Sequence, residues 1–327
     1  MKTLNASGGE AAGSVGGRAI MVESPLQLAV IVPATNRPPH LSACIAAIEA
    51  ADEAPEELIV VREPAGAGPA QARNDGASRA SAGVLVFVDA DVLVHADAFV
   101  RIRRWFAENP GLAAVFGAYD DEPSDSGVVS QFRNLLHHDV HEQGRGRAAT
   151  FWTGLGAIRR DAFVRSGGFD AARFPAPSIE DVELGVRLHA GGAWIELDPS
   201  IRGTHLKAWT MTDMVRTDFL HRGLPWSRLL LSGETRPHGL NLGTRHRLTA
   251  LAAATLVGGT LARRRDTAAR ASLAILALNW RFYRLVARRA GARAGVTAPA
   301  LHVVHHLVGL GAFLTAAAER LSKRLRG

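Results

Sequence analysis

The sequence has a single cysteine, Cys44, in 327 residues. One cysteine excludes an intrachain disulfide and the class of small disulfide-stabilised domains, and it is typical of a protein in a reducing compartment. Residues 1–25 show no apolar periodicity and lack the apolar segment of a signal peptide, so we expect a disordered leader there. The rest of the chain is long enough to bury a full core and to hold more than one structural unit.

Acidic residues are nearly absent from the last quarter of the chain. Residues 243–327 contain fifteen Lys and Arg residues but only two acids, Asp266 and Glu319, whereas residues 1–242 carry a net charge of −6. Such asymmetry favours contact with nucleic acid or with an anionic membrane. Because the basic residues are interleaved with aliphatic runs and form no nucleic-acid-reading motif, we expect a membrane partner and no nucleic acid.

Two uncharged runs lie in this basic region, at 248–262 and 299–318. The first is short for a membrane span and the second is only just long enough. Because the linker between them is rich in arginine, placing it outside the cell would violate the positive-inside tendency. Spanning helices and in-plane amphipathic helices both stay open, and we predict that residues 243–327 attach the protein to the cytoplasmic face of the cell membrane.

Short runs of β-branched residues alternate with helical patterns from residue 28 onward. This alternation predicts right-handed βαβ units and an α/β fold with a mainly parallel sheet flanked by helices. The expected strands are 28–32, 58–61, 84–88, 113–116 and 194–197. The expected helices are 39–51, 97–107, 128–141 and 180–190, and residues 68–80 are expected to form a loop that leads into a helix. The last of these strands is expected to end in a loop that reaches His205.

The strand Val84–Val88 ends abruptly in Asp89-Ala-Asp91. In open α/β sheets, ligands bind outside the carboxyl ends of the strands. Two carboxylates at that place suit a hard divalent cation such as Mg²⁺ that holds a diphosphate. The tripeptide alone is equally compatible with a solvated turn, because Asp is common in turns.

Two later segments carry groups that complete such a site. Asp181 begins a helix, where an acid either complements the helix dipole or acts as a general base toward a hydroxyl. His205 is a candidate metal ligand beside the acids. By contrast, His137, His138 and His141 have helical spacing, which we interpret as a polar helix face.

Four ordered motifs in residues 26–231 resemble family 2 glycosyltransferases of the GT-A fold. Their residues are Leu28-Ala-Val-Ile-Val-Pro33-Ala-Thr35-Asn36-Arg37, Gly68-Pro-x-x-Ala-Arg73-Asn74-x-Gly76 followed by Val86-Phe-Val-Asp89-Ala-Asp91, Phe151-Trp152-Thr-Gly154 with Gly167-Gly168-Phe169-Asp170, and Glu180-Asp181-x-Glu183-Leu184. The resemblance implies a GT-A domain at 26–242, followed by the basic helical region at 243–327. The C-terminal region of this chain resembles the membrane-associated extensions of relatives that use lipid-linked acceptors.

The resemblance implies an inverting transfer of a sugar from a nucleotide-diphosphate donor to a hydroxyl acceptor in cell-envelope polysaccharide synthesis. Asp91 would bind Mg²⁺ or Mn²⁺, with Asp89 on the donor ribose or the metal and His205 completing the metal shell. Asp181 would be the base, and Glu180 would orient the acceptor or support the site. Further residues are implied on the donor side at Pro33, Thr35, Asn36, Glu63, Arg73 and Gly154, and on the acceptor side at Trp152.

The chain departs from the family after its second strand, where relatives have two acids and a Gly-Ser but this sequence reads Arg62-Glu63-Pro64-Ala65-Gly66. Glu63 is the residue that could replace the missing base-binding acid. For Arg73, an ion pair inside the fold is an alternative to a donor phosphate. Two other functions stay open, namely a metal-dependent nucleotidyltransferase and a non-catalytic, membrane-bound GT-A binding module.

Overall fold

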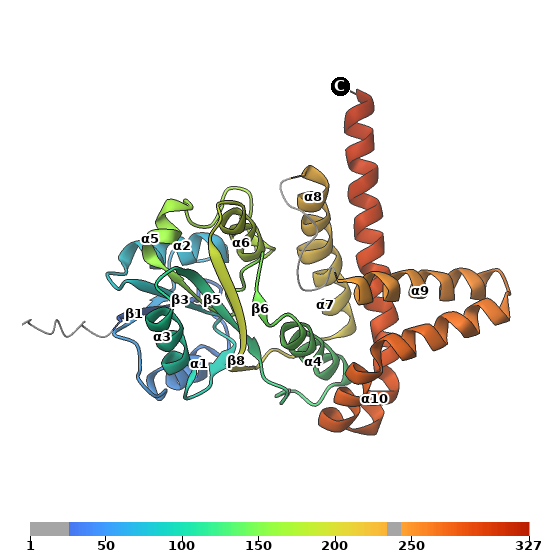
Figure 1. Ribbon diagram of the computed structural model, residues 1–327, viewed down its shortest axis with the longest axis horizontal. Coiled ribbons are helices and arrows are strands. Elements are labelled where there is room, and N and C mark those ends of the chain that lie inside the picture. Colours follow the sequence, from blue (N-terminus) through green and yellow to red (C-terminus); the bar gives the residue numbers. More distant parts are fainter. Residues whose placement is uncertain (1–25, 234–242, 327) are drawn as a thin grey trace, which may run out of the picture.

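The computed structural model describes residues 26–233 and 243–326. An α/β body and a helical part lie side by side, and the C-terminal helix extends well past the rest of the molecule (Figure 1). The leader expected at 1–25 lies outside the described residues.

One mixed sheet forms the body. Its strands are β1 (Leu28–Pro33), β2 (Glu57–Val61), β3 (Val84–Val88), β4 (Val92–Val94), β5 (Leu112–Tyr119), β6 (Gly146–Arg147), β7 (Leu155–Arg159) and β8 (Trp194–His205). The order is β2-β1-β3-β7-β5-β8-β4, and β6 pairs with β8. Strands β1, β2, β3, β5 and β8 run in one direction, and β7, β4 and β6 run against them. The expected mainly parallel sheet is confirmed, with an antiparallel strand inserted in its middle.

Helices cover both faces of the sheet (Figure 1). On one face, α1 (Leu41–Glu49) and α3 (Ala98–Glu108) pack on the side chains of alternate strand residues such as Val30 and Val86. On the other face, α2 (Pro69–Arg79), α5 (Arg160–Arg165) and α6 (Glu180–Ala190) pack on the intervening ones. Because every residue of β3 is buried, its continuous apolar run is that of a strand covered on both faces.

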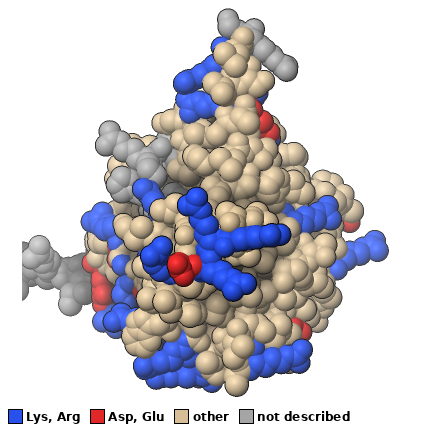
Figure 2. Space-filling model, turned by 90° about the vertical axis from the view of Figure 1, so that its right-hand side faces the viewer, with Lys and Arg blue, Asp and Glu red and all other residues tan. Residues whose placement is uncertain are grey.

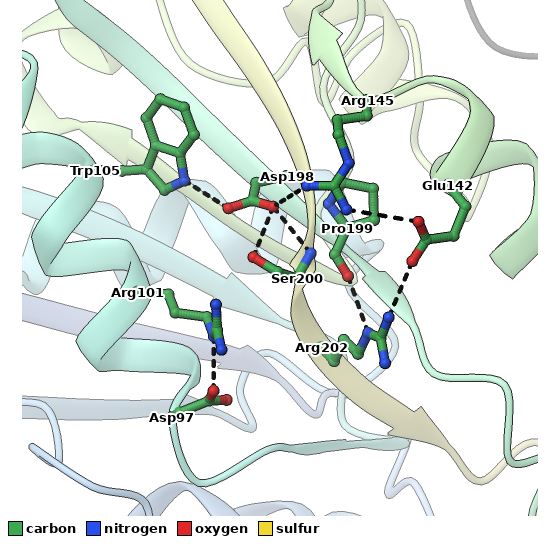
Figure 3. Close-up of polar contacts among 9 residues, drawn as sticks. All are labelled: Asp97, Arg101, Trp105, Glu142, Arg145, Asp198, Pro199, Ser200 and Arg202. Atoms are coloured by element: carbon green, nitrogen blue, oxygen red, sulfur yellow. Dashed lines mark hydrogen bonds and ion pairs between the residues drawn. The ribbon is translucent and has the colours of Figure 1, made fainter.

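Strand β8 continues through the loop that we expected before His205. Its pairing with β5 shifts register between Phe116 and Ala118, which creates a bulge around Asp198, Pro199 and Ser200. Figure 3 shows how side chains hold this bulge: the Asp198 carboxylate accepts hydrogen bonds from Ser200 and from Trp105 Nε1 at 2.7 Å. The bulge explains the loop-like sequence, and the strand resumes beyond it to His205.

The helical part has its own apolar core. It consists of α4 (Val128–Gln143), α7 (Met211–Arg216), the π-helix η1 (Thr217–Gly223), α8 (Leu224–Ser232), α9 (Thr244–Leu261) and α10 (Arg265–Arg326). Buried residues of α4, α7, α9 and α10, among them Phe132, Met214, Ala253 and Phe282, form one cluster. The basic region at 243–327 therefore shares its core with α4 from the preceding part.

Helix α10 is bent, since Asn279 and Gly291 depart from helical φ/ψ and Pro299 lies inside it. Its first portion pairs with α9 as a projecting hairpin (Figure 1). Among the described residues, one helix is long and apolar enough to cross a membrane by length and composition alone. This is Arg265–Leu325, where the most apolar window has a mean hydropathy of 1.5 and is 28% buried. The uncharged run at 248–262 lies in α9 and is not among such helices.

Candidate active site

The predicted donor-side residues gather where β1, β2 and β3 end. Thr35 follows β1, and its buried hydroxyl donates to the Ala67 carbonyl oxygen at 2.6 Å. This bond and Gly66 N–H to Thr35 O at 3.1 Å join the loop after β1 to the loop after β2. Glu63 is exposed in that second loop, where its carboxylate accepts the Ala65 N–H at 2.9 Å. Pro33 is half-buried and Asn36 is exposed, so both loops border one solvent-facing edge of the sheet.

Arg73 joins the first Asp of the strand end to the acidic helix. Its two terminal nitrogens donate to Asp89 at 2.7 Å and to Glu180 Oε1 at 2.8 Å, and its side chain is 5% exposed. The alternative that we kept for Arg73, an ion pair inside the fold, is the one found. A buried arginine between two carboxylates joins the segments that carry them, because removing it would leave both without their cation.

Asp181 lies next to this ion pair and behaves differently. Its carboxylate accepts hydrogen bonds from the Thr153 N–H at 3.2 Å and the Thr153 hydroxyl at 3.3 Å. Burial and the neighbouring Glu180 charge raise the pKa of Asp181 to about 6, although Arg73 opposes the rise. A carboxylate with a pKa near neutrality is suited to accept a proton from a substrate.

The second Asp of the strand end faces a histidine. Strand β4 pairs with β8 in a register that sets Val92 opposite His205, which brings His205 Nε2 to 3.5 Å from the Asp91 carboxylate. The other ring nitrogen, Nδ1, donates to Asn134 Oδ1 at 2.7 Å. In the neutral ring the Nε2 lone pair therefore points at a carboxylate oxygen, an arrangement that favours a cation between the two groups.

A carboxylate and an imidazole at this distance are suited to a divalent cation bound through oxygen and nitrogen. Across residues 26–233 and 243–326, however, no three His, Cys, Asp or Glu side chains gather into a metal site. The third predicted ligand, Asp89, is engaged by Arg73.

Residues 58–220 match the model of a family described as glycosyltransferase like family 2. They are a family 2-like glycosyltransferase domain. The transferase is similar in fold to mannosyltransferase PcManGT from Pyrobaculum calidifontis in complex with GDP-Man and Mn²⁺, with a TM-score of 0.53 and 16% identity over 88% of this chain and 87% of that one. This likeness shows the GT-A fold.

GalNAc-T7 with UDP, GalNAc and Mn²⁺ aligns at a TM-score of 0.43 and 15% identity, over 64% of this chain and 48% of its own. No curated protein sequence matches the chain.

The histidines of α4 in the transferase are not a polar face, and that prediction is wrong. His138 and His141 are buried, and their Nδ1 atoms lie 2.9 and 2.8 Å from the carbonyl oxygens of Tyr119 and Gly117. Buried polar groups require a partner, and the two imidazoles find theirs in these carbonyl oxygens of β5. The helical spacing correctly indicated one face, but that face points inward.

Trp152 and Gly154 of the transferase are packed against each other. A Cβ atom at Gly154 would lie 2.1 Å from the Trp152 indole, so the glycine makes room for this ring. The Gly154 carbonyl oxygen also accepts the Asp89 N–H at 3.2 Å. Trp152 is half-buried and contacts Tyr119, His137 and His141 edge to face or tilted. This cluster forms a rigid wall between Asp181 and His205.

Sequence reasoning missed three side chains of the site. The Tyr119 ring stacks on His205 with 4.2 Å between centroids and 7° between planes. Asn134 fixes the His205 ring through Nδ1. Lys207 lies over the Trp209 indole at 4.1 Å, and its charge helps to lower the pKa of Asp91. The predicted strand at 113–116 stopped three residues before Tyr119, where β5 ends, and Asn134 and Lys207 carry no motif.

Proposed function

We propose that the protein transfers a sugar from a nucleotide-diphosphate donor to a hydroxyl acceptor, with inversion at the anomeric carbon. The observation that carries this proposal is the Arg73 bridge between Asp89 and Glu180. Because of it, the end of β3 that would hold the donor diphosphate and the helix that bears Asp181 lie at one edge of the sheet. The complex of PcManGT with GDP-Man and Mn²⁺ supports a donor and a metal of these classes.

In the proposed reaction Asp181 takes the proton of the acceptor hydroxyl. The acceptor oxygen forms a bond to the anomeric carbon from the face opposite the donor phosphate. The bond between that carbon and the phosphate oxygen breaks, and the nucleoside diphosphate leaves with the electron pair. One attack on the opposite face inverts the configuration, so no covalent enzyme intermediate is needed.

The negative charge on the leaving diphosphate is the main electrostatic demand of the reaction. Asp91 and His205 would hold Mg²⁺ or Mn²⁺, with the free oxygen of Asp89 nearby, and the ion would neutralise the diphosphate. Arg73 holds Asp89 in place, and both of its terminal nitrogens are engaged by carboxylates. Pro33, Thr35, Asn36 and Glu63 border the space proposed for the nucleoside, and Trp152 forms the wall proposed for the acceptor.

We propose further that residues 26–242 form the catalytic domain and that the basic region 243–327 holds it on the cytoplasmic face of the membrane. Exposed apolar side chains on α9 and α10, including Leu251, Leu261, Leu273 and Trp280, support this proposal. Arginines at the tip of the α9–α10 hairpin complement anionic headgroups. A lipid-linked or membrane-proximal glycan of the cell envelope is the acceptor that suits this placement.

The experiment that tests the function is a product assay with a panel of nucleotide sugars, with and without Mn²⁺. We expect nucleoside diphosphate as the product and loss of turnover in Asp91→Ala, which stays folded. Release of pyrophosphate would instead identify a nucleotidyltransferase. Donor binding without any turnover across the panel would identify a non-catalytic binding module.

A further inference from the structure

An open groove runs along α7 and η1, directly after the segment that carries His205 and Lys207. It has a volume of about 490 Å³ and is lined by Met211, Thr212, Val215, Arg216, Phe219 and Leu220. Met211, Val215 and Phe219 recur every four residues, so they lie on one helix face. Met211 is 41% and Leu220 49% exposed, which is unusual for large apolar side chains that share one concave surface.

One end of this α7–η1 groove is tied to the Asp91–His205 pair. Helix α7 starts after Trp209, whose N–H donates to the buried Ser130 hydroxyl at 2.7 Å. The Trp209 indole supports Lys207 at 4.1 Å. The other end reaches the base helix, because the Ser178 hydroxyl donates to the carbonyl oxygen of His221 at 3.2 Å and the Ser178 N–H donates to Glu180 at 2.9 Å. The α7–η1 segment that lines the groove therefore follows the Asp91–His205 side of the candidate site at one end and contacts the helix of Glu180 and Asp181 at the other.

The back of the groove rests on the C-terminal helix. Asp218 of η1 is buried and lies 2.7 Å from His305 Nδ1 of α10 and 3.1 Å from the Arg133 guanidinium of α4. The Phe219 ring packs at Gly311, where an added Cβ would lie 3.7 Å from the ring. A molecule in the groove would thus lie between the helix proposed for the membrane and the catalytic carboxylates.

One arginine gives the groove a charge preference. Arg216 belongs to its lining and is exposed. Arg222 follows within two turns but is not part of the lining, and it is close enough to Tyr119 and Asp218 to affect the pKa of both. An apolar trough whose lining carries a guanidinium group complements an amphiphile with a phosphate headgroup.

We propose that the α7–η1 groove binds the hydrocarbon chain of a lipid phosphate, with Arg216 at the phosphate. The identity of this lipid as the acceptor rests on the proposed sugar transfer. In that case, the sugar or hydroxyl beyond the phosphate points along the His205–Lys207 segment toward Asp181. The groove thereby selects acceptors that carry both a chain and a phosphate.

The test is photo-crosslinking of the full-length protein in lipid nanodiscs with dodecyl phosphate that bears a terminal diazirine. Mass spectrometry is expected to find the adducts within residues 211–220. Leu220→Gln and Met211→Gln should each lower the yield at least about fivefold. The matched control is Val164→Gln on α5, which is 64% exposed and distant from the groove, and its yield should equal that of the unmodified protein.

A second probe with the same diazirine chain on maltose tests the phosphate contact. Arg216→Gln should lower the yield of the phosphate probe at least about threefold relative to the maltoside. The proposed lipid site would be refuted by adducts found only on the exposed leucines of α9 and α10. It would also be refuted if Leu220→Gln gave the same crosslinking yield as the unmodified protein. Crosslinking needs no sugar donor, so the two proposals can fail separately. If the groove is labelled but the protein shows no turnover, only the proposed sugar transfer is refuted. If the protein turns over but the groove is not labelled, only the proposed lipid site is refuted.

Discussion

The sheet body and the helical part both contain ion pairs with buried members, but these ion pairs have different roles. In the body, Arg73, Asp89 and Glu180 come from the loop and helix regions at the carboxyl edge of one sheet, and they surround the proposed chemistry. In the helical part, Asp218, Arg133 and His305 come from three helices and lie behind the groove. A buried ion pair is weak evidence for stability, but removing one partner is costly because it leaves an uncompensated charge. In the sheet body the ion pairs hold together the residues of the candidate site. In the helical part they hold together the helices behind the groove.

Replacing the proposed base should have the largest effect. In Asp181→Asn we expect transfer to fall about 10²–10⁴-fold, because a general base contributes a factor of that size. Donor affinity, measured by titration calorimetry, should be retained, since Asp181 contacts Thr153 and not the strand end. Asp161→Asn, at the exposed start of α5, is the control and should keep full activity. A collapse of donor affinity in Asp181→Asn would refute the role as base.

Removing the central cation of the body should be nearly as costly. Arg73→Met leaves the buried Glu180 and the half-buried Asp89 without their cation, and we expect a loss of about 3–5 kcal/mol in the free energy of unfolding by urea. Arg104→Met is the matched control, because Arg104 pairs with Glu108 at 2.8 Å on the exposed face of α3. That variant should unfold at an unchanged urea concentration. Equal behaviour of the two variants would show that the Arg73 bridge is not needed for the fold.

The two regions also differed in how far the sequence predicted them. Strand β3 and helix α6 have the expected bounds, because a continuous apolar run and an acidic first turn are local signals. Strand β4, only three residues long, and the part of β8 beyond Pro199 were missed because their pairing is decided by contacts far apart in sequence.

The site shows the same division. Asp91 and His205 were predicted from chemistry and resemblance, but only the register of β4 against β8 brings them together. Asn134 and Tyr119, which orient His205, are brought to it by tertiary packing and have no sequence motif. The inward direction of the α4 histidines likewise follows from tertiary contacts, with carbonyl oxygens of β5. In the helical part, spacing identified helices but not the face that each one buries.

The basic tip of the hairpin offers a test of the helical part as a membrane support. Figure 2 shows Lys and Arg side chains gathered on the face where the α9–α10 hairpin points, with few acids among them. Each arginine near an anionic bilayer contributes about 1 kcal/mol, so replacing Arg263, Arg264 and Arg265 by Gln should weaken vesicle binding up to about 100-fold. Co-sedimentation with vesicles containing phosphatidylglycerol measures this effect.

The matched control replaces Arg101 and Arg104 on α3 by Gln, which changes the charge of the body and not of the hairpin. Its vesicle binding should stay close to that of the unmodified protein. If both sets of substitutions weaken binding equally, the attraction comes from overall charge and the hairpin is not the membrane contact.

The smallest effect that we expect comes from the charge behind the groove. Asp218→Asn keeps the shape of the side chain and one acceptor oxygen, so the loss of folding free energy should be about 1–3 kcal/mol. In the unmodified protein the Arg133 and His305 side chains lower the pKa of Asp218 to about 2 despite its burial. A carboxylate whose folded pKa lies below its ordinary value of 3.8 stabilises the fold above pH 4, and this contribution is lost as the pH falls toward 2. The difference in urea midpoint between Asp218→Asn and the unmodified protein should therefore be full at pH 6 and shrink between pH 4 and pH 2. A difference that stays constant over this range would mean that Asp218 acts by packing alone. The helical part would then not depend on a buried charge, and the comparison with the ion pairs of the sheet body would fail.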